Sequence, residues 1–423
     1  MDLWSINPET GDFDKVGVGR VSEDGTVVET IEGGIINSSW HFFTPPPKEP
    51  NDPNEDPRNE KSGCKSCNKP APLTSEVELH SGAVIETHEL VTYQSLGGSR
   101  GLTLTYDSLR ADPRPILHFS YENVERSRLA PGFEDRLRLL ASLTIHGEDF
   151  DYEVPGFAGG EYGLQGGEHF WSLTPGSGPV SAAFQADLSH LPSGNYQYSL
   201  TSGIRLFVRN QFNGSSSTTT GKILHINGID SAFGSGWSLA GLIELVETEN
   251  GDILLIDGDG SELLFAAPST EGDTYRAPAG AFSTLEKLQN GTFRLTEKDK
   301  TVQLFNANNQ LASVTDSDGN KTQYVYDKNG LLTEIIEPTN LKTTFTYTSG
   351  KVTAITDPAG RVTQLQYDEF GNLISITDPD NSTRTWEYDH LHHMVAEVDQ
   401  RGNREETVYN FAGRAVGATR KDG

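Results

Sequence analysis

The sequence lacks any hydrophobic run long enough to cross a membrane as a helix. Hydrophobic side chains make up 35% of its 423 residues and occur in short clusters, whereas a spanning helix needs about 20 consecutive apolar residues. The acidic start, Met1 to Ser5, does not form a signal peptide. The chain stops inside a repeat at Gly423, so we interpret it as an excised fragment whose missing signal says little about the location of its parent.

Basic residues are few. Lys and Arg number 33 against 60 Asp and Glu, which gives a net charge of -27. This balance disfavours nucleic acid, which is bound through clustered Lys and Arg, and it disfavours anionic membrane surfaces. We interpret the excess as surface carboxylates that keep a large β-protein soluble, with adaptation to a saline habitat as the alternative.

Only two cysteines occur, Cys64 and Cys67. A structural zinc site needs four ligands, and no second Cys pair is present. A local disulfide or two free thiols in a loop is the expectation. A metal site completed by His or by a second chain, or a redox role, is the alternative, although no βαβ pattern surrounds the pair.

Helical periodicity is absent, and period-two apolar clusters separated by Gly and Pro predict an all-β chain. Its length favours several domains. We expect a small β-module at 1–44, a Pro-rich linker with the CxxC pair at 45–73, strands leading into a repeat region at 74–118, an immunoglobulin-like β-sandwich at 119–210, a Gly/Ser loop and a Gly-Ser-Gly-Trp segment at 211–240, and repeats at 241–423.

The predicted sandwich rests on short strands joined by Gly/Pro turns, a spacing typical of immunoglobulin-like folds. Its Gly-rich stretch carries three aromatic residues, Tyr162, Phe170 and Trp171. If exposed, these side chains would supply a carbohydrate-binding face.

A repeat of about 21 residues dominates the C-terminal part. Its clearest marks are five tyrosines spaced 21, 20, 21 and 21 residues apart: Tyr326, Tyr347, Tyr367, Tyr388 and Tyr409. Between them lie turn signals, which include Asp357, Pro358 and Gly360, and then Asp378 and Pro379. Asp first, Pro second and Gly fourth fit a type I turn. Such regularity indicates a repeat architecture.

Each repeat reads as a β-hairpin with one apolar face. The residue two before each Tyr is mostly large and apolar, and the partner strand carries an aliphatic residue at the matching place until Glu397 breaks the pattern. A single hairpin is too thin to bury this face, so neighbours should stack edge to edge. We interpret the Tyr column as a structural ladder; a ligand platform is the alternative.

These units resemble the RHS/YD-repeat family, in which similar hairpins form a β-ribbon that spirals into a hollow shell. The match is strong over about 241–423, Trp237 lies in a segment similar to the start of such repeat regions, and 76–118 resembles the segment before it. The resemblance implies a shell around a C-terminal toxic domain, as in toxin complexes, or an adhesive role, as in teneurins. No self-cleavage motif is recognisable, and about five good repeats are too few to close a shell.

Catalytic signatures are missing: no nucleophile elbow, P-loop, HExxH or Rossmann fingerprint occurs. We predict no enzyme, and no cofactor. Calcium is the rival idea, because two turns resemble the start of oxygen-ligand loops through Asp257 with Asp259 and Asp316 with Asp318. A His cluster at 390–393 is interpreted as a polar turn rather than a metal site.

The leading hypothesis is a non-catalytic scaffold of a secreted or cell-surface bacterial protein, partnered by the rest of its own chain. The alternative is a module for adhesion or carbohydrate binding that contacts a cell-surface glycan or protein. A hydrolase comes third. The sequence leaves open whether a toxic effector or a wall anchor follows.

Overall fold

The computed structural model divides the chain into two compact parts, Met1–Pro72 and Leu73–Gly423. The structure describes residues 2–6, 13–21, 28–33, 41–44, 75–78, 81–121, 137–150, 160–162, 169–172, 180–208, 211–214, 216–268, 272–410 and 412–420. Cys64 and Cys67 lie outside these ranges, so their predicted state stays a prediction. No helix in the ranges given is long and apolar enough to span a bilayer.

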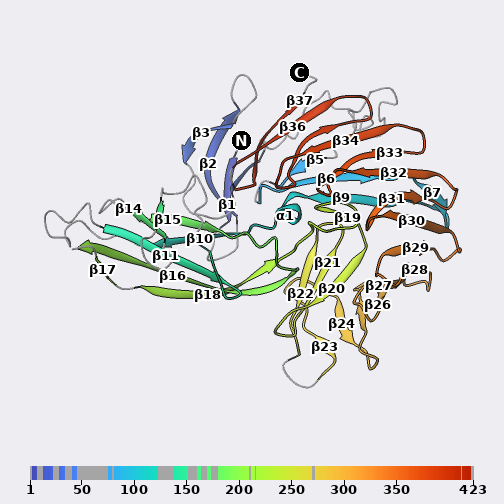
Figure 1. Ribbon diagram of the computed structural model, residues 1–423, viewed down its shortest axis with the longest axis horizontal. Coiled ribbons are helices and arrows are strands. Elements are labelled where there is room, and N and C mark those ends of the chain that lie inside the picture. Colours follow the sequence, from blue (N-terminus) through green and yellow to red (C-terminus); the bar gives the residue numbers. More distant parts are fainter. Residues whose placement is uncertain are drawn as a thin grey trace, which may run out of the picture. The chain divides into compact units, whose positions relative to one another are not determined.

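The first part contains an antiparallel four-stranded sheet of order β3-β2-β1-β4. Its strands are β1 (Asp2–Ile6), β2 (Phe13–Val21), β3 (Val28–Gly33) and β4 (His41–Thr44). The second part is also almost entirely β, as predicted, and carries the features of interest (Figure 1).

Two sheets near the start of the second part share one core. The smaller pairs β10 (Ile116–Tyr121) with β15 (Val180–Gln185). The larger contains β11 (Leu137–Ile145), β12 (Glu148–Phe150), β13 (Gly160–Tyr162), β14 (His169–Ser172), β16 (Gly194–Val208), β17 (Gln211–Gly214) and β18 (Ser217–His225). Leu139, Leu143 and Ile145 of β11 pack with Phe184 of β15 in this core. Several of its connections fall outside the described residues, so the immunoglobulin-like order remains a prediction.

The structure differs from the Gly/Ser loop expected at 211–240. Residues 217–225 form β18, which pairs with β16 over nine positions from Ser217 to His225. The segment has four β-branched residues, three consecutive threonines and an isoleucine, and β-branched side chains suit a half-exposed strand. The polar composition therefore marked a solvated strand rather than a loop.

A second, smaller sheet precedes the repeats and is here called the cap sheet. Its order is β19-β9-β6-β5, with a short hairpin and one helix beside it. The strands are β5 (Ser75–Val77), β6 (Val84–Glu89), β9 (Thr103–Asp107) and β19 (Trp237–Leu239), the hairpin is β7 (Tyr93–Ser95) with β8 (Gly98–Arg100), and α1 spans Ser108–Ala111. Asp107 caps α1 by accepting a hydrogen bond from the Leu109 amide.

The repeats form the largest sheet, here called the ribbon, in which fifteen antiparallel strands pair in chain order from β23 to β37. A three-stranded sheet precedes it, made of β20 (Ile243–Glu247), β21 (Ile253–Asp257) and β22 (Glu262–Phe265). The ribbon strands are β23 (Thr274–Tyr275), β24 (Thr284–Lys287), β25 (Phe293–Thr296), β26 (Val302–Phe305), β27 (Leu311–Thr315), β28 (Lys321–Tyr326), β29 (Leu332–Ile336), β30 (Lys342–Thr348), β31 (Lys351–Thr356), β32 (Val362–Tyr367), β33 (Leu373–Thr377), β34 (Thr383–Tyr388), β35 (Met394–Val398), β36 (Arg404–Tyr409) and β37 (Ala415–Arg420).

The ribbon turns use the predicted residues in one recurring geometry. The Asp357 amide donates to the Arg361 carbonyl at 3.0 Å, and the Gly360 amide donates to the Asp357 carbonyl at 2.9 Å. The Asp357 carboxylate accepts from the amides of Ala359 and Arg361. Gly360 has φ of +77°, the left-handed region that glycine enters without strain. Asp at the start and Gly at the fourth position therefore build the turn.

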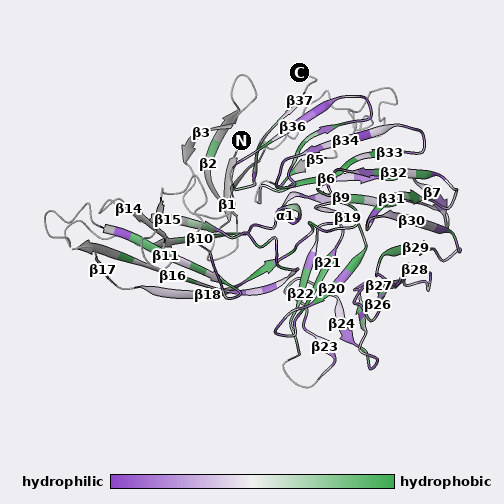
Figure 2. Cartoon of the chain, in the orientation of Figure 1, coloured by the Kyte–Doolittle hydropathy of each residue, from purple (hydrophilic) through white to green (hydrophobic). Residues whose placement is uncertain are grey.

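Hydrophobic and hydrophilic residues alternate within the ribbon strands, and Figure 2 shows the resulting mixture of green and purple along the chain. The apolar face of the central hairpins includes Ile335, Phe345, Ile355, Leu365 and Ile376, all buried. These side chains belong to the same core as residues of the cap sheet. One face of the ribbon is therefore closed by an earlier segment of the same chain.

Candidate functional site: the closed face of the ribbon

The five tyrosines of the repeat make the same contact in every hairpin. Each hydroxyl donates to the backbone carbonyl of the residue 15 positions earlier, at 2.7–2.9 Å. The pairs are Tyr326 with Leu311, Tyr347 with Leu332, Tyr367 with Val352, Tyr388 with Leu373, and Tyr409 with Met394. Each ring thus ties its own hairpin to the one before it.

Every one of these tyrosines also lies at a register shift. Tyr367 pairs with Leu373 while its neighbour Gln366 pairs with Ser375, so one residue of the partner strand is left over. Such a bulge re-aims a side chain locally. Burial raises the pKa of Tyr367 well above the ordinary tyrosine value, so its hydroxyl stays protonated and remains a donor near neutral pH.

The cap sheet inserts its own tyrosine into this face. Tyr106 of β9 is fully buried, donates to the His392 carbonyl at 2.8 Å and accepts from the Met394 amide at 3.0 Å. Its ring contacts Tyr388 edge to face at 6.0 Å between centroids. One cap side chain therefore satisfies the backbone of a ribbon turn.

Trp237, predicted to open the repeat region, lies at the centre of the aromatic cluster. Its indole nitrogen donates to the Tyr388 hydroxyl at 2.8 Å. Its ring meets Trp386 edge to face at 5.0 Å and lies 5.7 Å from Tyr106. Gly236, which precedes it, has φ of +75°, and a Cβ there would lie 2.6 Å from that of Ala111. We call Tyr106, Trp237, Trp386 and Tyr388 the aromatic junction.

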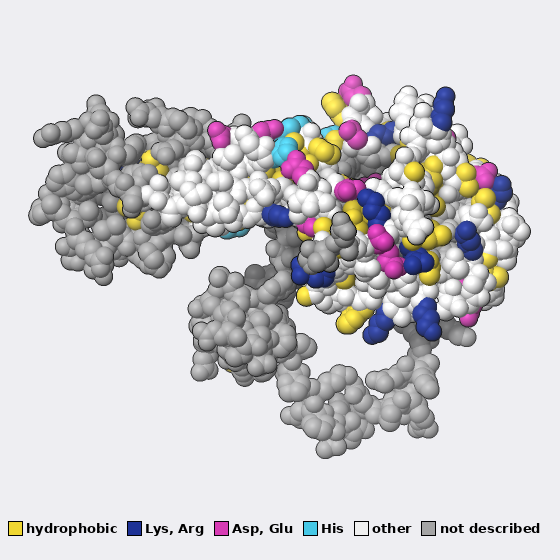
Figure 3. Space-filling view, turned by 90° about the horizontal axis from the view of Figure 1, so that it is seen from below, with side chains coloured by type: hydrophobic (Ala, Val, Ile, Leu, Met, Phe, Trp, Pro, Cys, Tyr) yellow, Lys and Arg dark blue, Asp and Glu magenta, His cyan; other side chains and the backbone are white. Residues whose placement is uncertain are grey.

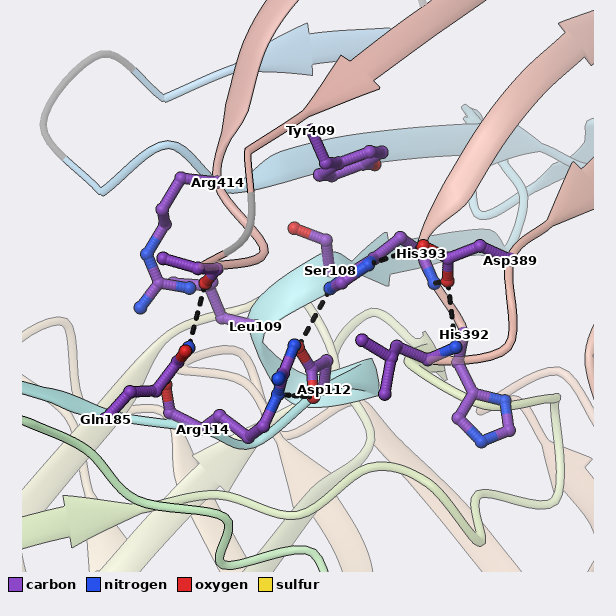
Figure 4. A network of polar contacts seen from close by, with 12 residues as sticks. Ser108, Leu109, Asp112, Arg114, Gln185, Asp389, His392, His393, Tyr409 and Arg414 are labelled. Carbon is purple, nitrogen blue, oxygen red and sulfur yellow. Dashed lines mark hydrogen bonds and ion pairs between the residues drawn. The ribbon is translucent and has the colours of Figure 1, made fainter. Parts of the chain in front are cut away.

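A polar network joins the cap to the last hairpins (Figure 4). His393 is buried, and its two ring nitrogens lie 2.9 Å from a carboxylate oxygen of Asp112 and of Asp389. Arg114 donates to both carboxylate oxygens of Asp112, one of which His393 also contacts. The imidazole also stacks on Tyr409 at 4.7 Å.

Electrostatics favour an imidazolium at this position. Burial lowers the pKa of His393, but the hydrogen bonds to Asp112 and Asp389 outweigh it and raise the pKa overall. Burial likewise raises the pKa of Asp112, yet His393 and Arg114 hold it below its usual value. Both imidazole nitrogens of His393 are occupied, so this residue ties the cap to the ribbon.

A second buried charge group explains why Glu397 breaks the apolar pattern. Arg384 forms ion pairs with Glu397 and, at 2.9 Å, with Glu86 of the cap sheet. Its guanidinium lies over the Trp386 ring at 5.5 Å. Glu397 is thus the counterion of a buried arginine shared by cap and ribbon.

The remaining predicted turn residues have structural contacts. Asp378 lies 3.5 Å from His88 of the cap sheet and accepts from Gln400. Pro358 and Pro379 occupy the second positions of their turns, where the hydrogen bonds of the turn need no amide donor.

Three of the four candidate calcium ligands, Asp257, Asp259 and Asp316, accept hydrogen bonds from backbone amides. Asp316 accepts from the amides of Asp318 and Asn320, and Asp257 accepts from those of Asp259 and Gly241. Within the described ranges, no group of three or more acidic, His or Cys side chains is arranged to hold a metal.

The backbone of Tyr162, Phe170 and Trp171 lies in β13 and β14, where Gly160 pairs with Trp171. Their side chains are outside what the structure describes, so the carbohydrate site stays a prediction.

Sequence reasoning missed the cap residues Tyr106, Asp112 and Arg114. The partners of Tyr106 and Asp112 lie more than 280 residues away in the chain, and single-sequence periodicity carries no signal for such pairs. His393 is the one member of this network that the sequence pointed to, as part of the His cluster, but its carboxylate partners were not predicted.

Charges on the visible surface are dispersed. Figure 3 shows Lys and Arg side chains of the described residues scattered among acidic and apolar ones on the face it displays, rather than gathered in one patch.

The RHS Repeat family model matches this chain four times, at residues 305–340, 326–362, 347–383 and 367–404. These overlapping matches cover the hairpins that carry the tyrosines up to Tyr388. No curated protein matches the chain.

Among solved structures, the crystal structure of TcdB2-TccC3-Cdc42 is 11% identical, with a TM-score of 0.26, and covers 56% of this chain and 16% of that one. The Tc holotoxin pore of Photorhabdus luminescens is 11% identical, with a TM-score of 0.26, 54% of this chain and 15% of that one. AggA, the major subunit of aggregative adherence fimbriae type I from Escherichia coli, is 12% identical, with a TM-score of 0.18, 34% of this chain and 93% of that one. The chain therefore spans less than a fifth of the first two.

Proposed function

Because residues 305–404 are RHS repeats, we propose that this chain is a non-catalytic scaffold of a secreted bacterial protein. In this proposal the ribbon forms part of a β-shell that encloses or displays a C-terminal effector. The rest of the same polypeptide is its main partner.

The observation that carries the proposal is the closure of the ribbon by the cap sheet. The tyrosine hydroxyls are all bonded to backbone, and the apolar face is buried under cap residues. Two backbone bonds also join the segments before the repeats to the ribbon, from the Val352 amide to the Ala232 carbonyl and from the Ala415 amide to the Gly82 carbonyl, both at 2.9 Å. Because these tyrosine hydroxyls and apolar side chains are engaged within the fold, they favour the role of a rigid wall over that of a substrate site.

The cap also supplies a second layer for much of the wall of repeats. A ribbon hairpin leaves its apolar face exposed unless another layer covers it. Here the segment around β6, β9 and β19 provides that layer for the hairpins from β29 to β35. The ribbon can then grow by one hairpin at a time, because each new Tyr bonds to the preceding hairpin.

Limited proteolysis of the natural protein, purified from the culture medium of its source, tests the proposal. We expect a resistant fragment that begins near Leu73 and a downstream segment that is cut only after denaturation. Immunoblotting of medium and cells tests secretion. A downstream segment that is cleaved equally fast before and after denaturation would contradict enclosure, and a protein confined to the cells would contradict secretion.

The alternative of carbohydrate binding rests on Tyr162, Phe170 and Trp171 and remains a prediction. A glycan array probed with the chain addresses it, with a triple alanine variant of these residues as control. Binding that the triple variant loses would support the alternative, and an array without hits would argue against it.

A further inference from the structure

A cavity of about 350 Å³ lies where the cap segment, β20 and the first tyrosine hairpins meet. The cap segment contributes Phe233 and Trp237 to its lining, the ribbon contributes Tyr326 and Tyr347, and β20 contributes Glu244. Small-molecule sites have volumes of about 300–1,000 Å³ and combine apolar walls with a few polar groups. The cavity matches the lower end of this range.

Glu244 is the distinctive group in this lining. Its neighbours on β20, Ile243 and Leu245, are buried in a core on one side of the strand. Glu244 points to the other side and is exposed, yet burial raises the pKa of its carboxyl against the lowering effect of Arg110. Both observations hold if the carboxylate is surrounded by protein but reaches solvent through the cavity.

Three other polar groups of the lining, Arg110, Asp257 and Gln310, are already engaged. Arg110 donates to the carbonyls of Asp257 and Ser261 and to Glu262. The Asp257 carboxylate accepts from two backbone amides, and the Gln310 amide donates to the Gly330 carbonyl.

The Glu244 carboxylate, by contrast, has neither a hydrogen bond nor an ion pair with any residue that the structure describes. Asp230, exposed in the same lining, adds a second negative charge. The cavity therefore offers an uncommitted carboxylate beside aromatic rings.

We propose that this cavity binds a small organic cation, an ammonium group carried on an aromatic or aliphatic body. The ammonium pairs with Glu244, and the body packs against the half-buried rings of Tyr326 and Tyr347. A partly desolvated carboxylate forms a stronger charge-assisted hydrogen bond than an exposed one, and aromatic faces attract cations. An anion is excluded by the same charges.

Isothermal titration of the 423-residue chain with tryptamine tests the proposal. We expect one saturable site, no binding of indole-3-propionate, and at least a tenfold loss of affinity in Glu244→Gln. Glu249→Gln is the control for general charge, because Glu249 is 71% exposed and lies outside the cavity lining; its affinity should equal that of the unchanged chain. Near-UV circular dichroism verifies that both variants are folded.

The pH dependence supplies a second readout. Affinity for tryptamine should fall as pH decreases through the raised pKa of Glu244, while the weak binding to Glu244→Gln should stay flat. Leu242→Trp, which fills the cavity, should abolish binding. Absence of saturable binding, or equal affinity in the unchanged chain and Glu244→Gln, would overturn the proposal.

Discussion

The indole nitrogen of Trp237 donates a hydrogen bond to the hydroxyl of Tyr388, 151 residues further along the chain, at 2.8 Å. The same hydroxyl donates to the Leu373 carbonyl at 2.9 Å. One oxygen thus connects the segment that opens the repeat region, the fourth tyrosine of the ladder and the hairpin before it. This bond fixes where the cap sheet meets the ribbon.

Replacing Trp237 by Phe should lower the free energy of unfolding by about 2 kcal/mol, because a hydrogen bond and part of a fully buried ring are lost. Tyr388→Phe should cost a similar amount. In the double variant the losses should not add, with a coupling energy of about 1 kcal/mol measured by chemical denaturation. Strictly additive losses would mean that the two side chains act independently.

The tyrosine ladder predicts that removing any one of its hydroxyls lowers the stability of the fold. Tyr367→Phe removes the donor to the Val352 carbonyl and should destabilise the chain by about 1–2 kcal/mol. Tyr347→Phe should behave alike, since its bond to Leu332 has the same geometry. Tyr198→Phe in the sandwich is the matched control and should leave the melting temperature nearly unchanged. A ladder variant that melts like the control would refute the structural role of the hydroxyl.

The ribbon turns predict a backbone effect. Gly360→Ala should destabilise by about 1 kcal/mol, because φ of +77° is strained for alanine although its Cβ would meet no atom within 4 Å. Gly360→Asn should lose less stability than Gly360→Ala, since Asn tolerates this conformation and already adopts it at Asn381, with φ of +67°. Thermal melts of the two variants show directly which is more stable. If Gly360→Ala were the more stable variant, side-chain contacts rather than backbone conformation would determine stability at this position.

The buried arginine predicts the largest effect. Arg384→Met leaves Glu86 and Glu397 without their shared cation and should cost about 3–5 kcal/mol. Arg404→Met is the surface control: Arg404 also pairs with two glutamates, Glu387 and Glu406, but in contact with solvent, and should hardly change the denaturation midpoint. Equal midpoints for the two variants would contradict a buried ionic tie.

The network around His393 predicts how stability depends on pH. The raised pKa of His393 adds stability that is complete below about pH 6.5 and is lost as pH rises through the folded pKa. The lowered pKa values of Asp112 and Asp389 add stability that is present above about pH 4 and is lost as pH falls further. The contribution of the network is therefore greatest between these limits.

We expect His393→Gln to flatten the decline in melting temperature above pH 6.5. The exposed His190 provides the control, and His190→Gln should keep the decline. Arg114, His392 and Arg414 also face this network, so the titration of His393 itself should be followed by NMR. A decline that persists unchanged in His393→Gln would place its origin elsewhere.

The repeat itself could be predicted from the sequence because its determinants are local. Period-two alternation, Asp and Gly at fixed turn positions and a Tyr every 20 or 21 residues each follow from contacts between neighbouring hairpins. The buried positions Phe345, Leu365 and Trp386 were identified in the same way. These features need no knowledge of distant segments.

The sequence by itself thus determined an all-β chain with a ribbon of tyrosine-marked hairpins and one apolar face. Only the tertiary structure decided what covers that face. The cap residues Tyr106 and Asp112 meet His392 and His393 across more than 280 positions, and Glu397, which looked like a flaw in the repeat, pairs with Arg384. Such contacts depend on how the cap sheet docks on the ribbon, which no local pattern encodes. Trp237 was recognised as the start of the repeats, and the structure shows that it is bonded to their fourth tyrosine.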